Sequence, residues 1–160
     1  MASLTLKAIV VYYTRFGNTR KAAEAIRDGI KEGGLETVEC KDVKDVKPEE
    51  LAQYDVIVIG TPTHYGGVAD KMRAFMGALK QVDLKGKNSA AFDTRYEGEK
   101  TGGSEELEKY MKEFGMNIIL RGLPVLLRAG DAWGPLRDAE PRKCKEFGKA
   151  IAQKVSSKKA

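Results

Sequence analysis

The stretch LKAIVVYYTRFGNT, residues 6–19, joins an apolar run to a short polar loop that contains one glycine. Residues 6–13 are almost continuously apolar and rich in Ile, Val and Tyr, which is typical of a parallel strand buried on both faces. Residues 19–32 then carry apolar side chains at helical spacing from Ala22 to Ile30. A buried strand, a loop and an amphipathic helix in this order predict the first unit of an α/β domain with a parallel sheet.

The same alternation of short apolar runs and amphipathic stretches continues along the rest of the chain. Further strands are expected at residues 37–43, 54–59, 89–92 and 118–127. Helices are expected at residues 70–79 and 105–114 and from Pro141 onward. Gly122 and Pro124 interrupt the last apolar run, so this fifth strand is expected to be bulged or broken in its middle. The pattern indicates a single domain over residues 1–160.

Length and composition limit the class of protein. The chain has 160 residues, of which 42% are hydrophobic and 32% charged, as expected for a globular domain with a substantial core. No apolar run approaches the roughly 18 residues that a membrane helix needs, and the N-terminus shows no secretion signal. We therefore expect a cytoplasmic protein that does not bind membranes. Cys40 and Cys144 are expected to be reduced thiols rather than a disulfide or metal ligands.

The net charge of +5 is concentrated in the last segment of the chain. Residues 141–160 contain seven Lys and Arg against a single acidic residue, Glu146, which gives this segment +6 and the other 140 residues −1. Two interpretations stay open: a solvated helix face that ends in a flexible basic tail at residues 156–160, or a docking patch for an acidic partner. Because the excess is not spread over the whole body, nucleic acid is not an expected partner.

Three loops are expected at one edge of the sheet, where ligands bind in open parallel sheets. They span residues 14–19, 61–67 and 93–103. In the first loop, two hydroxyls, a glycine and the opening amides of a helix provide a site for a phosphate. The patterns GxxxxGK[ST] and GxGxxG are absent, which excludes P-loop and dinucleotide-binding proteins. A helix capped by Thr14 or Asn18, without any ligand, is the alternative.

The sequence TRFGNT at residues 14–19 resembles the phosphate loop of flavodoxins, which is written T/S-x-T-G-x-T. It departs from this pattern at Phe16, where a hydroxyl residue is common, and Arg15 is more basic than the pattern suggests. The resemblance implies that this loop binds the phosphate of FMN. The implied phosphate-binding residues are Thr14, Arg15, Phe16, Gly17, Asn18 and Thr19.

The second loop, TPTHYGG at residues 61–67, is similar to the flavodoxin loop P-T-W-x. His64 stands where a tryptophan often stacks on the flavin ring, and Tyr65 is the neighbouring alternative for that role. The resemblance implies cofactor contacts by Thr61, Pro62, Thr63, His64, Tyr65 and Gly66. The alternative interpretations are an exposed turn residue for His64 and packing onto Met72 or Met76 for Tyr65.

The third loop, DTRYE at residues 93–97, resembles the flavodoxin stretch D-S-S-Y-E. The resemblance implies that Tyr96 lies on the outer face of the flavin and that Thr94 and Arg95 contribute amides to its pyrimidine edge. Asp93 completes the implied cofactor-binding set, and a plain surface aromatic is the alternative for Tyr96. Arg95 replaces a small residue, and it is interpreted either as a cation beside the pyrimidine or as a solvated side chain.

These three loops in this order indicate a member of the flavodoxin family, with similarity over residues 5–154. The resemblance implies a three-layer, doubly wound, five-stranded parallel sheet in the order 2-1-3-4-5. It also implies FMN as cofactor and electron transfer between redox partner proteins. No acid–base dyad, nucleophile or metal-ligand set is legible, so we expect no catalytic and no metal-binding residues. Trp133 is expected to pack in the core, with an approach to the flavin edge as the alternative.

Two other functions stay open. Residues 60–63 and 72–75 also resemble NAD(P)H:quinone oxidoreductases built on the same fold, so a small FMN-dependent quinone or nitro reductase is the first. The second is a regulatory or binding domain of this fold without flavin. Well-known flavodoxins are acidic, whereas this chain is basic. The difference implies an unusual partner, such as an acidic protein, or docking through the near-neutral flavin edge.

Overall fold

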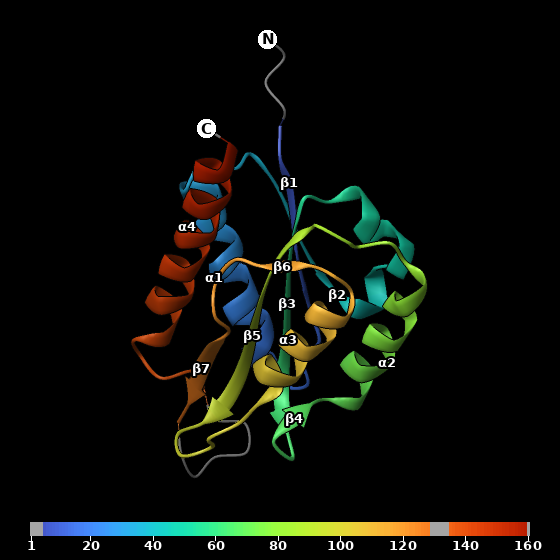
Figure 1. The fold of residues 1–160 in the computed structure, drawn as a ribbon. Helices are drawn as coiled ribbons and strands as arrows, with labels where there is room; N and C mark the ends of the chain where they lie inside the picture. Colours follow the sequence, from blue (N-terminus) through green and yellow to red (C-terminus); the bar gives the residue numbers. More distant parts are fainter. Residues whose placement is uncertain (1–4, 129–134, 160) are drawn as a thin grey trace.

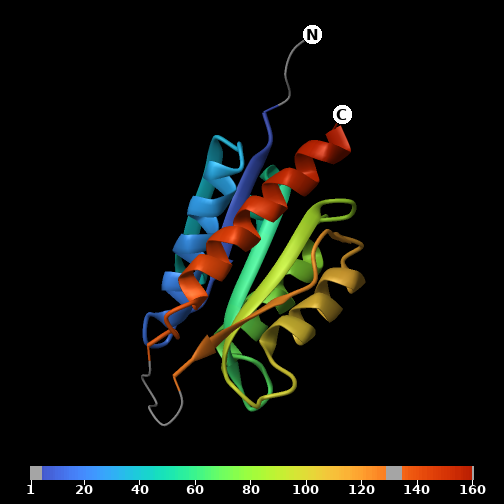
Figure 2. The same ribbon diagram turned by 90° about the vertical axis from the view of Figure 1, so that its left-hand side faces the viewer.

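The chain folds as a parallel sheet between two layers of helices, as seen in a computed structural model (Figure 1). The structure describes residues 5–128 and 135–159. The helices are α1 (Asn18–Glu32), α2 (Asp70–Ala78), α3 (Gly103–Glu113) and α4 (Glu140–Lys159). α1 and α4 lie side by side on one face of the sheet, while α2 and α3 cover the other face, as Figure 2 shows from the side. This arrangement confirms the predicted three layers.

Parallel strands form the sheet in the order β2-β1-β3-β5-β6. Their bounds are β1 (Lys7–Tyr12), β2 (Thr37–Asp42), β3 (Val56–His64), β5 (Asn88–Tyr96) and β6 (Asn117–Ile118). β7 (Leu123–Leu127) also pairs with β5, further along that strand, and β4 (Gly67–Val68) pairs antiparallel with the end of β3. With β6 and β7 counted as one interrupted strand, the order is the predicted 2-1-3-4-5.

The fifth strand is interrupted, as predicted, but the break covers residues 119–122: it includes Gly122, whereas Pro124 lies within β7. Between β6 and β7, the amide of Gly122 donates to the Glu108 carboxylate at 3.0 Å. Gly122 also lies so close to Ser104 that an added Cβ would stand 2.8 Å from the Cβ of that serine. The missing side chain therefore lets the start of α3 pack closely against this edge of the sheet.

The strands are buried on both faces because alternate side chains enter different cores. Ala8 and Val10 of β1 pack against α1 and α4, whereas Ile9 and Val11 pack against α2 and α3, and all four are fully buried. This burial explains why residues 6–13 read as a continuous apolar run.

The structure also differs from the sequence-based expectation at several element ends. β3 and β5 extend to His64 and Tyr96, so the second and third predicted loops begin as strands. They extend because β4 and β7 supply hydrogen-bonding partners beyond the expected ends. α4 continues to Lys159, into the residues expected as a tail. Among residues 5–128 and 135–159, no helix is both long and apolar enough to cross a bilayer.

Both cysteines are free thiols, as predicted. Burial raises the pKa of Cys40 to about 11. Burial and the nearby Glu140 carboxylate raise the pKa of Cys144 to about 12. Both thiols are therefore protonated at neutral pH and behave as small apolar side chains.

Candidate functional site

A pocket of about 310 Å³ opens at the edge of the sheet where β1, β3 and β5 end. This volume falls at the lower end of the range of small-molecule sites, roughly 300–1,000 Å³. The pocket is lined by Thr14, Arg15, Phe16, Asn18, Thr19, Pro62, Thr63, His64, Thr94, Arg95, Tyr96 and Leu127. The three segments singled out in the sequence therefore meet around one cavity.

The first loop leads directly into the N-terminus of α1. Gly17, with a φ of 96°, is the N-cap residue of α1 and has no side chain that could cap the helix. Thr14 instead closes the loop, because its Oγ1 accepts a hydrogen bond from the Gly17 amide at 2.9 Å. The first turn of α1 carries no acidic residue. The positive end of the helix dipole is therefore not neutralised by a neighbouring carboxylate, which is the environment that a phosphate prefers.

Arg15 adds positive charge to this part of the pocket. Its guanidinium carbon lies 5.1 Å from the centre of the Phe16 ring, in a cation–π contact. Partial burial, assisted by the charge of Arg15, lowers the pKa of His64 below its ordinary value. His64 is therefore neutral at pH 7, and a neutral imidazole can lie against an uncharged aromatic ring.

The second loop forms a tight hairpin between β3 and β4. His64 pairs with Gly67, so the turn consists of Tyr65 and Gly66, with φ angles of 53° and 78°. Two successive positive φ angles are typical of the turn that joins antiparallel strands over two residues. Tyr65 is fully exposed and does not pack on Met72 or Met76. The hairpin thus directs His64 to the pocket and Tyr65 to solvent.

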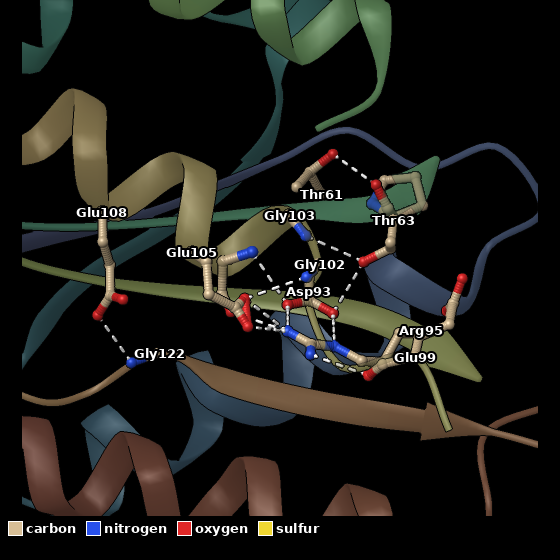
Figure 3. A network of polar contacts seen from close by, with 12 residues as sticks. Thr61, Thr63, Asp93, Arg95, Glu99, Gly102, Gly103, Glu105, Glu108 and Gly122 are labelled. Carbon is tan, nitrogen blue, oxygen red and sulfur yellow. Dashed lines mark hydrogen bonds and ion pairs between the residues drawn. The ribbon is translucent and has the colours of Figure 1, made fainter. Parts of the chain in front are cut away.

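The third segment is the end of β5, which lies between the other two. The hydroxyls of Thr94 and Thr19 are hydrogen-bonded at 3.0 Å, which joins this segment to α1. Tyr96 lines the pocket and is half-buried. Arg95 is 5% exposed, so the interpretation as a solvated arginine is wrong. Its guanidinium turns inward to Asp93 and Glu105 (Figure 3).

Eleven of the sixteen predicted cofactor residues line the pocket, and five do not. The five are Gly17, Thr61, Tyr65, Gly66 and Asp93. Gly17, Tyr65 and Gly66 set the backbone path of the two turns, while Thr61 and Asp93 are fully buried. Thr61 accepts a hydrogen bond from the Ala69 amide at 3.1 Å, so it supports the hairpin rather than the pocket wall.

Leu127 is a lining residue that the sequence reasoning missed. It reaches the pocket because β7 pairs in register with β5, placing Leu127 opposite Tyr96. Nothing local in the sequence signals this pairing. Trp133, which is expected to pack in the core with an approach to the flavin edge as the alternative, lies outside the described residues. In the part of the chain that the structure describes, no group of three or more His, Cys, Asp and Glu residues could hold a metal ion.

The family of the chain follows from comparison with known proteins. The sequence profile of the family described as "Flavodoxin domain" matches residues 9–129, which include all three segments of the pocket. The chain belongs to the flavodoxin family.

Relatives cover nearly the whole chain. An NAD(P)H dehydrogenase (quinone) from Archaeoglobus fulgidus is 27% identical, over 92% of this chain and 96% of that protein. A flavodoxin from Clostridium saccharobutylicum is 25% identical, over 94% of this chain and 98% of that protein. The solved structure of a flavodoxin from the domain Archaea superposes with a TM-score of 0.78 at 30% identity, and covers 94% of this chain and 99% of that one. The chain therefore shares the entire flavodoxin fold with these proteins.

Proposed function

We propose that the protein binds FMN and carries electrons between redox partner proteins. The observation that carries this proposal is the convergence of three segments on one pocket. The N-terminus of α1, whose first turn carries no acidic residue, lies on one side of the pocket, and His64 and Tyr96 line it from β3 and β5. Such a pocket suits a ligand with an anionic group at one end and a flat aromatic system at the other.

The residues present fit FMN by their chemistry. The N-terminus of α1, with Thr14, Thr19 and the charge of Arg15, would hold the phosphate. His64 and Tyr96 would contact the ring system, and Pro62 and Leu127 would exclude water from it. When bound, FMN supplies the redox chemistry at its ring. The protein's own residues bind and orient the cofactor.

Partner proteins would dock at the mouth of the pocket. Phe16 is 48% exposed and Tyr65 fully exposed, and both project beside the site from different loops. Exposed aromatic residues of this kind are enriched at protein interfaces. The basic residues of α4 offer less support for an acidic partner, because several lysines already form ion pairs. These pairs are Lys143–Glu140, Lys145–Glu32 and Lys149–Glu146.

Stepwise anaerobic reduction of the FMN-loaded protein, followed by its visible spectrum, tests the carrier function. We expect bound flavin to accept electrons from a chemical reductant and to return them to an added protein acceptor. We also expect little consumption of NAD(P)H when a quinone is the sole acceptor. A sample that shows no flavin absorbance after FMN is added and excess cofactor removed would refute the proposal.

A small NAD(P)H:quinone reductase is the second candidate. Its support is the full-length similarity to the NAD(P)H dehydrogenase (quinone) of Archaeoglobus fulgidus. Steady oxidation of NAD(P)H by a soluble quinone, without any partner protein, would favour this enzyme over the carrier.

A further inference from the structure

A buried ionic cluster lies beside the pocket, and the proposed function gives it no role so far (Figure 3). Thr63 and Arg95 belong to the cluster and also line the pocket. Asp93 is fully buried and Arg95 is 5% exposed. Arg95 Nε lies 2.8 Å from Asp93 Oδ1, and its terminal nitrogen lies 2.5 Å from Oδ2 of the same carboxylate. That nitrogen also contacts both carboxylate oxygens of Glu105 at 2.9 Å. One guanidinium thus joins β5 to the first turn of α3.

The cluster also reaches the end of β3, the second of the three segments that line the pocket. Thr63 of β3 donates its hydroxyl to Asp93 Oδ1 at 3.0 Å, and the same hydroxyl accepts from the Gly103 amide at 3.0 Å. Arg95 further donates to the backbone carbonyl of Glu99 at 3.4 Å. The end of β3 is therefore connected to the loop after β5 and the start of α3 through Asp93 and the arginine that binds it.

The packing around this arginine leaves little room. A Cβ added to Gly102 would stand 2.6 Å from Thr63 Oγ1 and 2.7 Å from the guanidinium carbon of Arg95. Within residues 5–128 and 135–159, every buried side-chain nitrogen and oxygen has a hydrogen-bond partner. The cluster is thus fully satisfied, which a buried charged group requires.

The charges of the cluster do not cancel. Asp93 and Glu105 contribute two negative charges and Arg95 one positive charge, so the three groups carry −1 next to the pocket. Without Arg95, the negative charges of the two carboxylates beside the site would be uncompensated. A reduced flavin carries more negative charge than an oxidised one, so the charge of this cluster acts on the two redox states unequally.

We propose that Arg95 is a positioning residue for the flavin: it fixes Asp93, which binds the end of β3, it holds the loop after β5, and it offsets the two carboxylates beside the pocket. This inference rests on the proposed binding of FMN. Arg95 orients the Asp93 carboxylate that binds Thr63, and it donates to the Glu99 carbonyl, so it holds the segments that carry His64 and Tyr96 in place before the cofactor binds. Through its charge, it limits the repulsion that a reduced flavin meets.

Three variants separate the charge of Arg95 from its geometry. Arg95→Gln leaves the two carboxylates uncompensated, so FMN affinity should fall about tenfold and the midpoint potential should become more negative. Glu105→Gln removes one negative charge, so the potential should become more positive. Arg95→Lys keeps the charge but loses the planar fork, so affinity should fall while the potential stays close to that of the wild type.

Arg73→Gln is the matched control. Arg73 forms an ion pair with Glu106, the neighbour of Glu105 on α3, at 3.1 Å, but it does not line the pocket. We expect this variant to keep the affinity and the potential of the wild type. Thermal unfolding of each protein without FMN shows whether a variant is folded before its affinity and potential are measured.

The opposite shifts of Arg95→Gln and Glu105→Gln are the decisive result, because a merely structural role would not move the potential in both directions. If wild-type protein binds FMN and both variants keep its affinity and potential, the proposed role of Arg95 is overturned. If Arg95→Gln does not fold, the other two variants decide: a more positive potential in Glu105→Gln and a lower FMN affinity in Arg95→Lys support the proposal, and wild-type values in both overturn it. Wild-type protein that takes up no FMN would instead refute the proposed function.

Discussion

Tyr65 and Gly17 both hold positive φ angles beside the pocket, at 53° and 96°. Glycine adopts such angles freely, whereas a tyrosine held there is strained by about 1–3 kcal/mol. Strain of this kind gathers at sites where a ligand or partner is bound. Tyr65 is also fully exposed, so its position is consistent with a contact to a redox partner.

Replacing Gly17 tests the left-handed conformation at the start of α1. No other atom lies within 4 Å of the place where its Cβ would stand, so Gly17→Ala meets no clash. The strained φ alone should lower the free energy of unfolding by about 1–2 kcal/mol. Gly77→Ala is the control: it also has open space but lies inside α2, so it should raise stability by about 0.5–1 kcal/mol. Urea unfolding measures both, and equal effects of the same sign would contradict the assigned conformation.

The protonation of His64 should make stability depend on pH. Because partial burial and Arg15 lower the pKa of His64 in the folded protein, the unfolded chain takes up this proton first as the pH falls. His64 therefore contributes its full share to the free energy of unfolding above the pKa of the unfolded chain, about 6.5. This contribution is lost as the pH falls from there through the lower pKa of the folded protein. His64→Gln should lose less stability on acidification than the wild type. Urea unfolding across this pH window provides the comparison, and identical losses in both proteins would exclude His64 as the cause.

At the scale of the elements, α1 and α4 pack with their backbones close together. A Cβ on Gly29 would stand 2.0 Å from the carbonyl oxygen of Lys145, and one on Gly148 would stand 2.1 Å from that of Ile26. These two glycines let the helix backbones approach each other. The contact lies toward the C-terminal half of α1, away from the end of the helix at the pocket.

Gly148→Ala should therefore disturb the fold without disturbing the site. Its methyl group would meet backbone atoms, which cannot rotate away, so we expect a loss of about 1–3 kcal/mol in the free energy of unfolding. FMN affinity of the folded variant should match the wild type. A variant as stable as the wild type in denaturant titration would show that the helices are further apart than described.

Helices and strands could be predicted from the sequence where the local pattern of apolar residues determines them. The run from Ile9 to Val11 identifies β1 because a strand buried on both faces needs apolar residues throughout. The ends of β3 and β5 could not be predicted, because pairing with β4 and β7 determines them. The same long-range pairing brings Leu127 to the pocket. The direction of Arg95 depends on Glu105, which α3 places beside it, and no spacing rule joins these two residues.

At the scale of the whole molecule, folding creates the pocket. Its walls come from four segments between Thr14 and Leu127, so the unfolded chain has no equivalent site. Binding of a cofactor should therefore stabilise the fold by mass action.

FMN present at 100 times its dissociation constant should raise the free energy of unfolding by about 2.7 kcal/mol. Gly148→Ala should gain the same amount, because its substitution is remote from the pocket. Denaturant unfolding with and without FMN gives both values. An unchanged midpoint in the presence of FMN would mean that the folded chain does not bind it selectively.

The central claim is that the N-terminus of α1 receives the phosphate of FMN. Fluorescence titration of the cofactor-free protein with FMN and, in parallel, with riboflavin tests it most directly, because the two ligands differ only in the phosphate. Charge-assisted hydrogen bonds contribute about 1.5–3 kcal/mol each, so FMN should bind at least about 100-fold more tightly than riboflavin. Equal affinity for the two ligands, or binding of neither, would contradict the claim.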